Sequence, residues 1–493
     1  MNLLPLAVHT AAQNRALDRH AIEVLGIASY TLMMRAGAAA YSALREGWPR
    51  ARRILVVCGP GNNGGDGYVL ARLAHQAGLA VLASATSDPQ QLKGDARRAM
   101  EEFVQAGGKL EAWTLEHVRG VDLVVDAIFG TGLSRPLDGR AASQVNAINA
   151  CGAPVLSLDI PSGLHADTGE ALGAAIIAER TVTFMGLKLG FYTGVGQDHT
   201  GTVLFDALDV PADALSCVAP AAVRISEEEV RAALPRRPRT AHKGANGRVL
   251  VLGGGRGMPG AARMAGEAAL RVGAGLVTIA TRPENVAAIA GMRPELICRA
   301  VERPDELTSL IERADVLAVG PGLGQDEWAR AMFDAAVGSD KAMVLDADGL
   351  NLLAQRPSAN ARWVLTPHPG EAARLLGSTV AQVQADRLGA GRALIARYQA
   401  TVVLKGAGTL VASEASLPAI CDRGNPGMAS AGMGDVLTGV IAGLIAQGVD
   451  SQAAARVGVL VHAMAGDKAA RRGERGLIAS DLFEHLQSCV NPI

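Results

Sequence analysis

The sequence predicts two successive α/β domains, each built on a mainly parallel sheet. Short apolar runs alternate with helical patterns, the alternation restarts near residue 248, and glycine-rich turns follow many of the runs. Open parallel sheets bind ligands at the carboxyl ends of their strands, where such turns lie. We therefore expect one ligand site in each domain.

The first domain is expected over residues 1–215. Residues 14–37 have the pattern of two helices joined by a turn at Gly26. The segment Arg53–Cys58 is apolar after its first residue, as in a parallel strand buried on both faces, and it leads into a glycine turn and a helical pattern. The further strands expected in this domain are Ala80–Ser84, Val121–Ile128, Pro154–Ile160 and Arg180–Met185.

Residues 216–244 are expected to form an exposed linker. The pattern weakens after Phe205, and the segment ends in the proline- and arginine-rich stretch Pro235–Gly244, which favours an extended, solvated chain. The alternative is a surface loop inside one large domain, but Arg248–Leu252 begins a second alternation, assigned to a domain over residues 245–493. The strands expected after it are Leu276–Ala280, Val316–Val319, Met343–Leu345, Trp363–Leu365 and Thr401–Leu404.

The composition argues against several kinds of partner. Lys and Arg total 47 against 48 Asp and Glu, so no overall positive field attracts nucleic acid or an anionic membrane. Aromatic residues make up only 3%, too few for the stacking platforms of single-stranded nucleic acid. The six cysteines form no C-x-x-C pair, and the N-terminus has no signal-peptide pattern. We expect a cytoplasmic homo-oligomer that acts on small molecules, with no nucleic-acid or membrane partner.

The stretch Gly424–Gly439 runs from a glycine-rich loop into an amphipathic helix. The start of such a helix offers unpaired N–H groups and the positive end of the helix dipole, which suit phosphate. Asp435 lies where this helix begins. It either caps the helix or accepts a proton from a hydroxyl that attacks bound phosphate.

Two segments, Gly59–Gly64 and Gly255–Gly260, match the pattern G-x-G-x-x-G. The first follows a strand and opens a helix, and Asp88 lies after the next strand, so an NAD-dependent dehydrogenase stays open. Against this reading, the turn carries two Asn and one Asp, whereas a dinucleotide turn requires small uncharged residues near the pyrophosphate. The sequence contains no G-x-x-x-x-G-K-[S/T] motif, which excludes P-loop phosphoryl transfer.

Oxygen-bearing side chains follow the strands of both domains. In the first, Asp126, Asp159 and Ser162 join the Asn and Asp residues of the glycine turn. Such oxygen ligands, without His or Cys, suit an alkali or alkaline-earth cation and disfavour zinc or copper. In the second, His368 could be a solvated loop residue and Glu371 a first-turn helix residue favoured by the dipole.

Several of these motifs together resemble the ribokinase-like superfamily. They are Gly432–Asp435, Lys405–Thr409 and Thr366–Glu371. In that superfamily the Asp of a G-x-G-D turn deprotonates an acceptor hydroxyl, and the glycine-rich turn holds phosphate. Gly253–Ala274 and Val319–Gly324 narrow the resemblance to the ADP-dependent NAD(P)H-hydrate dehydratases.

The first domain resembles the NAD(P)H-hydrate epimerase domain, a Rossmann-like three-layer fold that uses K⁺. The motifs that carry this likeness are Asn62–Gly67, Asp126–Pro136 and Asp159–Ser162. In the order found here, the motifs span nearly the whole chain and imply an epimerase fused to a dehydratase. One position departs from the family pattern, because Leu32–Gly37 contains Met34 where the family has Glu.

The resemblance implies a role for each matching position. In the first domain it places K⁺ against Asn63, Asp126 and Ser162. It places the hydrated nucleotide against Asn62, Asn63, Gly64, Gly65, Asp66, Gly130, Thr131, Gly132, Leu133, Ser134, Arg135, Pro136 and Asp159. In the second domain it places the hydrate against Ala261, Gly322, His368 and Asp435. It places ADP, with Mg²⁺ on its phosphates, against Lys405, Gly406, Ala407, Gly408, Thr409 and Gly434.

The implied substrate is NADH or NADPH damaged by addition of water across the C5–C6 bond of the nicotinamide ring. ADP would phosphorylate the C6 hydroxyl with Asp435 as base, and loss of phosphate would restore NAD(P)H. The first domain would interconvert the R and S hydrates with Asp159 as acid and base. Two alternatives stay open, namely an NAD-dependent dehydrogenase and a ribokinase-like small-molecule kinase whose N-terminal domain only binds, for which Met34 is the hint.

Overall fold

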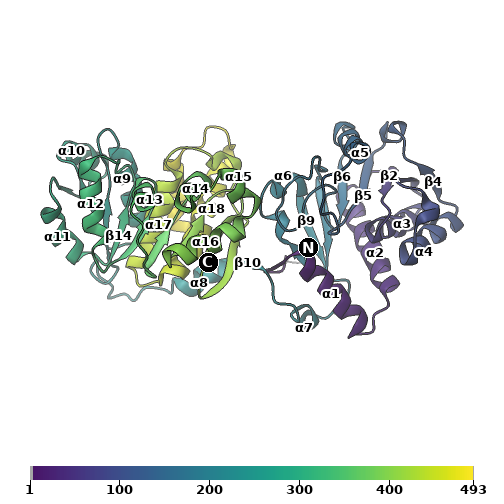
Figure 1. Ribbon diagram of the computed structural model, residues 1–493, viewed down its shortest axis with the longest axis horizontal. Helices are drawn as coiled ribbons and strands as arrows, with labels where there is room; N and C mark the ends of the chain where they lie inside the picture. Colours follow the sequence, from purple (N-terminus) through teal and green to yellow (C-terminus); the bar gives the residue numbers. More distant parts are fainter. Residues whose placement is uncertain (1–3, 492–493) are drawn as a thin grey trace. The chain divides into compact units, whose positions relative to one another are not determined.

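The computed structural model describes residues 4–491. The chain divides into two compact units, Met1–Ala222 and Val223–Ile493 (Figure 1). Each unit has a mainly parallel sheet with helices packed against it, which confirms the predicted fold class. Among residues 4–491, no helix has the length and apolarity needed to cross a bilayer.

The first unit contains a seven-stranded sheet with the order β4-β3-β2-β5-β6-β7-β9, in which all neighbours are parallel. Its strands are β1 (Ala7–His9), β2 (Arg53–Cys58), β3 (Ala80–Ala85), β4 (Lys109–Ala112), β5 (Leu123–Ala127), β6 (Val155–Leu158), β7 (Arg180–Phe184), β8 (Leu187–Lys188) and β9 (Thr202–Asp206). Its helices are α1 (Ala11–Glu23), α2 (Ser29–Gly47), α3 (Asn62–Gln76), α4 (Gly94–Gln105), α5 (Gly139–Ala150), α6 (Gly196–Thr200) and α7 (Ala212–Leu215).

Strand β2 shows why this unit has three layers. Successive side chains of a strand point to opposite faces, so Ile54 belongs to the core beneath α2, α3 and α4, while Leu55 packs with Val145 of α5 on the other face. The buried strands were predictable from their apolar runs. The edge strands β4 and β9 were not predicted, because they are only partly buried and carry polar residues.

The second unit contains strands in the order β13-β12-β11-β14-β15-β16-β17-β18-β19-β10. The neighbours are parallel except along β17, β18 and β19, which are antiparallel. Its strands are β10 (Ala222–Arg224), β11 (Arg248–Leu252), β12 (Leu276–Thr281), β13 (Ile297–Ala300), β14 (Val316–Val319), β15 (Ala342–Leu345), β16 (Trp363–Leu365), β17 (Thr401–Leu404), β18 (Thr409–Ser413) and β19 (Ser416–Cys421).

The helices of the second unit enclose this sheet. They are α8 (Glu227–Ala233), α9 (Pro259–Arg271), α10 (Pro283–Met292), α11 (Pro304–Arg313), α12 (Glu327–Val337), α13 (Asp348–Gln355), α14 (Pro369–Leu376), α15 (Val380–Ala385), α16 (Arg387–Tyr398), α17 (Met433–Ala446), α18 (Ser451–Ala469) and α19 (Phe483–Cys489). Helix α17 is the most apolar part of the core, where Val436, Val440 and Ile441 pack against α9, α18 and the sheet. Its start is therefore fixed firmly in place.

The predicted linker over residues 216–244 differs from the structure. The division falls between Ala222 and Val223, and Val223 pairs with Ala419 of β19. Val230 of α8 is fully buried in the core of the second unit. The stretch Pro235–Gly244 has no helix or strand and is largely exposed. Elements as short as β10 and α8 give too few apolar repeats to be recognised in the sequence.

Candidate active sites

A cavity of about 840 Å³ lies at the carboxyl ends of the parallel strands in the first unit. The predicted contacts that line it are Asn62, Asn63, Asp66, Gly130, Thr131, Gly132, Leu133, Ser134, Arg135, Pro136 and Asp159. Gly64 and Gly65 are buried and do not line it. A Cβ on Gly64 would lie 2.1 Å from the carbonyl oxygen of Gly59, so this glycine lets α3 begin close to the strand.

Asp159 follows β6 in a left-handed conformation, with φ 64°. A residue other than glycine in this region costs roughly 1–3 kcal/mol, and such strain is often found at functional sites. Asp159 Oδ1 accepts a hydrogen bond from Lys188 Nζ, which also donates to Thr183 Oγ1 at 2.7 Å and to the Phe184 carbonyl at 3.0 Å. Lys188 is only 1% exposed. All three donors of this ammonium group are therefore used, and one of them holds Asp159.

Sequence reasoning missed Lys188. Its signal was available, because Lys188 is the only charged residue between Phe184 and Phe191, and a lysine in such an apolar segment needs a partner. Asp159 Oδ2, the oxygen that Lys188 does not contact, faces the loop at Gly130. A Cβ on Gly130 would lie 3.4 Å from this oxygen and 3.5 Å from Cβ of Asn63. The structure thus brings Asp159, Gly130 and Asn63 together.

Asp126 and Ser162, two of the predicted K⁺ ligands, are hydrogen-bonded to each other. The Asp126 carboxylate accepts from Ser162 Oγ at 2.6 Å, from the Ser162 N–H at 2.9 Å and from Ser157 Oγ at 2.9 Å. Burial raises the pKa of Asp126, although these hydrogen bonds act in the opposite direction. Ser162 Oγ also lies 3.2 Å from the Phe129 carbonyl oxygen.

Asn63, the third predicted ligand, has a buried side-chain amide. Neither its Oδ1 nor its Nδ2 has a hydrogen-bond partner among residues 4–491. Buried polar groups are nearly always satisfied, so this amide marks a place where a ligand can bind. Asn63 meets the 129–136 loop at Gly130, next to Phe129, which contacts Ser162. The amide, hydroxyl, carbonyl and carboxylate oxygens of this set fit a K⁺ ion.

Asp66, on α3, also lines the cavity. Burial, together with the negative charges of Asp159 and Asp18, raises the pKa of Asp66 well above its ordinary value. Met34 does not line the cavity, and its sulfur lies 2.9 Å from Nη2 of Arg72. The residue that departs from the family pattern is therefore not part of the cavity lining.

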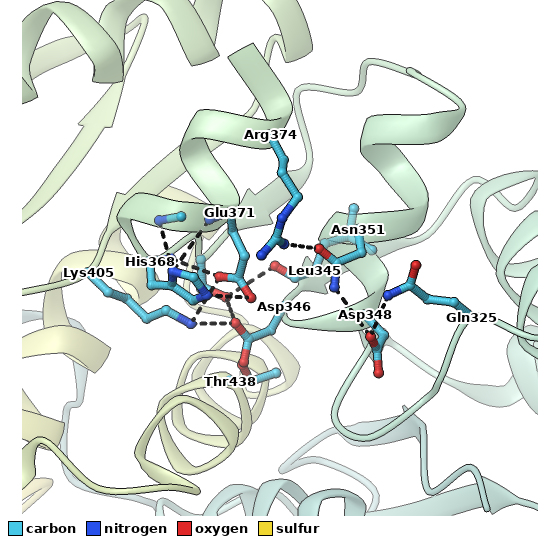
Figure 2. A network of polar contacts seen from close by, with 12 residues as sticks. Gln325, Leu345, Asp346, Asp348, Asn351, His368, Glu371, Arg374, Lys405 and Thr438 are labelled. Carbon is cyan, nitrogen blue, oxygen red and sulfur yellow. Dashed lines mark hydrogen bonds and ion pairs between the residues drawn. The ribbon is translucent and has the colours of Figure 1, made fainter. Parts of the chain in front are cut away.

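Asp346 is the centre of the polar network in the second unit (Figure 2). It follows β15, is 1% exposed, and accepts hydrogen bonds from Thr366 Oγ1 at 2.9 Å, Thr438 Oγ1 at 2.9 Å and Lys405 Nζ at 2.6 Å. Burial by itself would raise the pKa of Asp346, but the charge of Lys405 and these hydrogen bonds outweigh it and lower the pKa. The next residue, Ala347, has φ 47°, so this strand end is strained like that at Asp159.

Lys405 also approaches a second carboxylate, since its Nζ lies 3.8 Å from Oε2 of Glu371. Burial by itself would lower the pKa of Lys405, but the charges of Asp346 and Glu371 raise it overall. His368 caps α14, because its Nδ1 accepts the N–H of Gly370 at 2.9 Å and its own N–H donates to Glu371 Oε2 at 2.8 Å. With Nδ1 as an acceptor, the proton of a neutral ring is on Nε2, on a side chain that is about half exposed. His368 is thus a cap whose Nε2 lies 3.5 Å from Oε1 of Glu371, on a ring edge exposed enough to donate to a ligand.

Helix α17 begins at Met433 after Gly432, whose φ is 90°. Asp435 is in the first turn and is not the cap, so the capping interpretation is wrong. The N–H groups of Gly434 and Asp435 have no hydrogen-bond partner within residues 4–491. A Cβ on Gly434 would lie 3.2 Å from Lys405 Nζ and 3.3 Å from Asp346 Oδ2. An ammonium group and free amides therefore face one small region, which suits an anion, and the Asp346 carboxylate that also borders it is paired with Lys405.

Asp435 has the properties of a base that works near neutral pH. Burial and the negative charge of Asp346 raise the pKa of Asp435 to about 7, although Lys405 acts in the opposite direction. A carboxylate with such a pKa can both hold and release a proton at physiological pH. Thr438, one turn further along α17, donates to Asp346 and so connects the helix to the strand ends.

The predicted hydrate contacts Ala261 and Gly322 lie side by side. Gly322 has φ 58°, and a Cβ on it would lie 3.0 Å from Cβ of Ala261. The Gly255 N–H donates to the Gly322 carbonyl at 2.5 Å, so the turns after β11 and β14 are joined. A Cβ on Gly432 would lie 2.7 Å from Cε of Met264, which puts α9 beside the start of α17. The predicted ADP-binding segment, Lys405–Thr409, connects β17 to β18.

The fold and the site of the second unit define a ribokinase-like protein. A solved ribokinase-like superfamily protein from Enterococcus faecalis is 29% identical, with a TM-score of 0.51, over 54% of this chain and 95% of that chain. A protein of Streptococcus mutans is 30% identical, with a TM-score of 0.50, over 54% of this chain and 98% of that chain. The predicted ribokinase-like fold is confirmed.

The sequence comparisons define the family more narrowly. Residues 249–488 match the NAD(P)H-hydrate dehydratase family, and residues 29–190 match the YjeF-related protein N-terminus family. The chain is 47% identical over 481 residues to the bifunctional NAD(P)H-hydrate repair enzyme of Coxiella burnetii, covering 97% of this chain and 98% of that protein. It is 46% identical over 491 residues to that of Escherichia coli, covering 99% and 95%. The chain belongs to the family of bifunctional NAD(P)H-hydrate repair enzymes, and the resemblance seen in the sequence is confirmed.

Proposed function

We propose that this chain repairs hydrated NADH and NADPH in two steps. The first unit interconverts the R and S hydrates at C6, and the second uses ADP to dehydrate the S hydrate, with release of AMP and phosphate. Membership of the family supports both activities. The observation that carries the second is the arrangement of Asp435, with its pKa near 7, beside free amides and Lys405.

The dehydration begins with proton transfer to Asp435. As the C6 hydroxyl oxygen attacks the β-phosphorus of ADP, the Asp435 carboxylate accepts the hydroxyl proton and the bond to AMP breaks. The lone pair of the ring nitrogen then expels phosphate from C6, and loss of a proton from C5 restores the ring double bond. Hydroxide would be a poor leaving group, so phosphorylation is what makes the elimination possible.

The residues around Lys405 would stabilise the negative charge of the phosphates during this reaction. Lys405 and the N–H groups of Gly434 and Asp435 would stabilise the phosphoryl oxygens. Mg²⁺ fits this site mainly through the ADP phosphates, with the Glu371 carboxylate beside Lys405 as a protein ligand, and it would neutralise phosphate charge. The turns at Ala261 and Gly322 would hold the hydrate.

In the first unit, Asp159 would act as acid and base at the C6 oxygen, protonating the hydroxyl group as it leaves with help from the ring-nitrogen lone pair and deprotonating the water that adds back to either face, and Lys188 would hold its carboxylate in place. K⁺ would be held by Asn63, Asp126 and Ser162, and would supply a fixed positive charge at the base of the 129–136 loop. The remaining lining residues of that loop would bind the nucleotide. We also infer that the chain acts in the cytoplasm as a homo-oligomer; its six cysteines are all unpaired, as in a reducing compartment.

The decisive test mixes the full-length chain with both hydrate epimers and measures the absorbance of reduced nicotinamide. With ADP and Mg²⁺ we expect both epimers to return to NAD(P)H, and without ADP we expect no return. The chelator EDTA should stop the reaction. A chain that restored no absorbance with any adenine nucleotide would not have this function. A chain that reduced NAD⁺ with an alcohol, independently of ADP, would be a dehydrogenase.

A further inference from the structure

Arg387, at the start of α16, lies behind the loop that connects β17 to β18. It is 4% exposed. Its Nη2 donates to the carbonyl of Leu404 at 3.0 Å, to that of Lys405 at 3.2 Å and, more weakly, to that of Gly408 at 3.5 Å. Nη1 donates to Oε1 of Gln384 at 2.8 Å. Nη2 thus contacts both ends of the loop while Nη1 is anchored on Gln384, and the single nitrogen of a lysine cannot make both sets of contacts.

These contacts determine which way the loop presents its N–H groups. In a trans peptide the C=O and the following N–H point in opposite directions, so the Lys405 carbonyl that turns toward Arg387 directs the Gly406 N–H away from it. Gly406 is exposed, with φ 129°, and neither its N–H nor that of Ala407 has a hydrogen-bond partner within residues 4–491. The loop therefore offers free donors on the side opposite Arg387.

The positive charge of Arg387 has no counter-ion in the described part of the chain. Burial lowers the pKa of Arg387 to about 10, and no neighbouring carboxylate opposes this effect. A buried charge without a partner is costly. The guanidinium packs against the backbone of Gly406 from behind the loop, because a Cβ on Gly406 would lie 3.3 Å from Nη1, so only this backbone separates the charge from the free N–H groups. An anion bound on the loop would supply the missing negative charge.

We propose that Arg387 is a positioning residue which shapes the Lys405–Gly408 loop, and that its charge makes the loop select phosphate-bearing ligands over uncharged nucleosides. This inference rests on the proposed function, since it takes the loop to be the ADP site. It assigns the preference for a charged nucleotide to a residue that does not itself touch the nucleotide.

The test measures binding of ADP and of adenosine to the full-length chain by equilibrium dialysis. Arg387→Met removes both the charge and the forked donors, whereas Arg387→Lys keeps the charge and loses the fork. Arg392→Met, at an exposed position on the same helix, is the matched control. We expect Arg387→Met to weaken ADP binding about tenfold and adenosine binding less than about threefold, with Arg387→Lys intermediate and Arg392→Met unchanged.

Steady-state kinetics should likewise show an effect on ADP binding that is larger than the effect on turnover or on hydrate binding. The KM for ADP should rise about tenfold in Arg387→Met, while kcat at saturating ADP and the KM for the S hydrate change less than about twofold. Interconversion of the epimers, which takes place in the first unit, should not change. Retention of the KM for the hydrate would show that the second unit is folded.

Each contrary result has a distinct meaning. If wild-type chain binds ADP and Arg387→Met binds it equally well, the inference is wrong and the proposed function stands. If the variant weakens ADP and adenosine equally, the selection by charge is wrong. If Arg387→Lys matches wild type, the bridging geometry is not needed. Wild-type chain that bound no ADP would instead overturn the proposed function, and this inference with it.

Discussion

The two candidate sites use the same parts in different ways. Each has a lysine that pairs with a carboxylate at the end of a parallel strand, Lys188 with Asp159 and Lys405 with Asp346. Each has a strained backbone at that point, at Asp159 itself in the first unit and at Ala347 in the second. Parallel α/β sheets place polar residues at strand ends, so two sites in different folds can contain the same kind of lysine–carboxylate pair.

The difference is in which carboxylate the lysine holds. In the first unit the paired carboxylate, Asp159, lines the cavity. In the second unit the paired carboxylate, Asp346, is enclosed by two threonines, and the candidate base is a separate residue, Asp435, on a helix. In the proposed mechanism, one residue of the first site both pairs with a lysine and transfers protons, whereas in the second site two residues divide these tasks. The division leaves Asp435 free to have a pKa near 7.

The largest expected effect comes from Asp435→Asn. Asparagine has nearly the same shape but cannot accept the hydroxyl proton, so ADP-dependent repair of the S hydrate should fall about a thousandfold. Interconversion of the R and S hydrates should stay at the wild-type rate, because it belongs to the other unit. Both rates can be measured on one preparation. Repair within tenfold of wild type would remove Asp435 from the mechanism.

The second-largest effect tests whether Asp159 of the first unit both pairs with Lys188 and transfers protons. Asp159→Asn should slow exchange between the epimers about a hundredfold and leave repair of the S hydrate unchanged. Lys188→Met should also slow exchange, because it removes the partner of a cavity-facing carboxylate. The rates can be followed by chromatography of the two epimers. Normal exchange in Asp159→Asn would show that Asp159 is not the acid and base of this reaction.

The sequence alone predicted the parts of the two sites that consecutive residues form, namely the strands and the turns that follow them. Arg53–Cys58 and Trp363–Leu365 were predicted with the bounds that the structure has, because parallel strands buried on both faces are apolar throughout. The glycine turns after the strands were equally visible. Family resemblance, and not physical pattern, gave the individual roles around them.

The sequence could not show contacts between distant residues. Asp346 is held by Thr366, 20 residues away, and by Thr438, 92 residues away, and neither threonine lies in a recognisable motif with it. Lys188 belongs to a strand of two residues, too short for any periodicity. The position of Asp435 depended on a helix boundary, because Asp435 would be the cap only if the helix began three residues later than it does.

A smaller effect, on the pH dependence of repair, tests whether Lys405 controls the pKa of the separate base Asp435. With Asp435 as the proposed base, repair requires its ionised form, so the rate should rise with pH and reach half its maximum near pH 7. The charge of Lys405 lowers the pKa of Asp435, so Lys405→Met should shift this midpoint to higher pH by about one unit, in addition to any loss of rate. The pH profile of kcat for the S hydrate measures this. An unchanged midpoint in Lys405→Met would mean that Lys405 does not control the base.

The smallest effect is on stability. The pKa of Asp435 is about 7 in the folded chain, above its ordinary value of 3.8, so the folded state binds this proton more tightly than the unfolded state. The resulting stabilisation is complete below about pH 4 and is lost as the pH rises through 7. Asparagine does not titrate, so above pH 7 Asp435→Asn should have a free energy of unfolding higher than that of wild type.

The size of this gain follows from the shift. Three pKa units correspond to about 4 kcal/mol, and partial exposure of Asp435 reduces the expected gain to about 1–2 kcal/mol. Pulse proteolysis in urea, with peptides from residues 223–491 identified by mass spectrometry, gives this value for the second unit at pH 8 and at pH 5. The gain should shrink at the lower pH. Asp159→Asn, which removes a carboxylate that has an ion-pair partner, should instead destabilise the first unit, because it leaves Lys188 buried without one. Opposite signs for the two variants would show that the second site accepts a loss of stability to obtain its base, whereas equal signs would mean that both carboxylates are held in the same way.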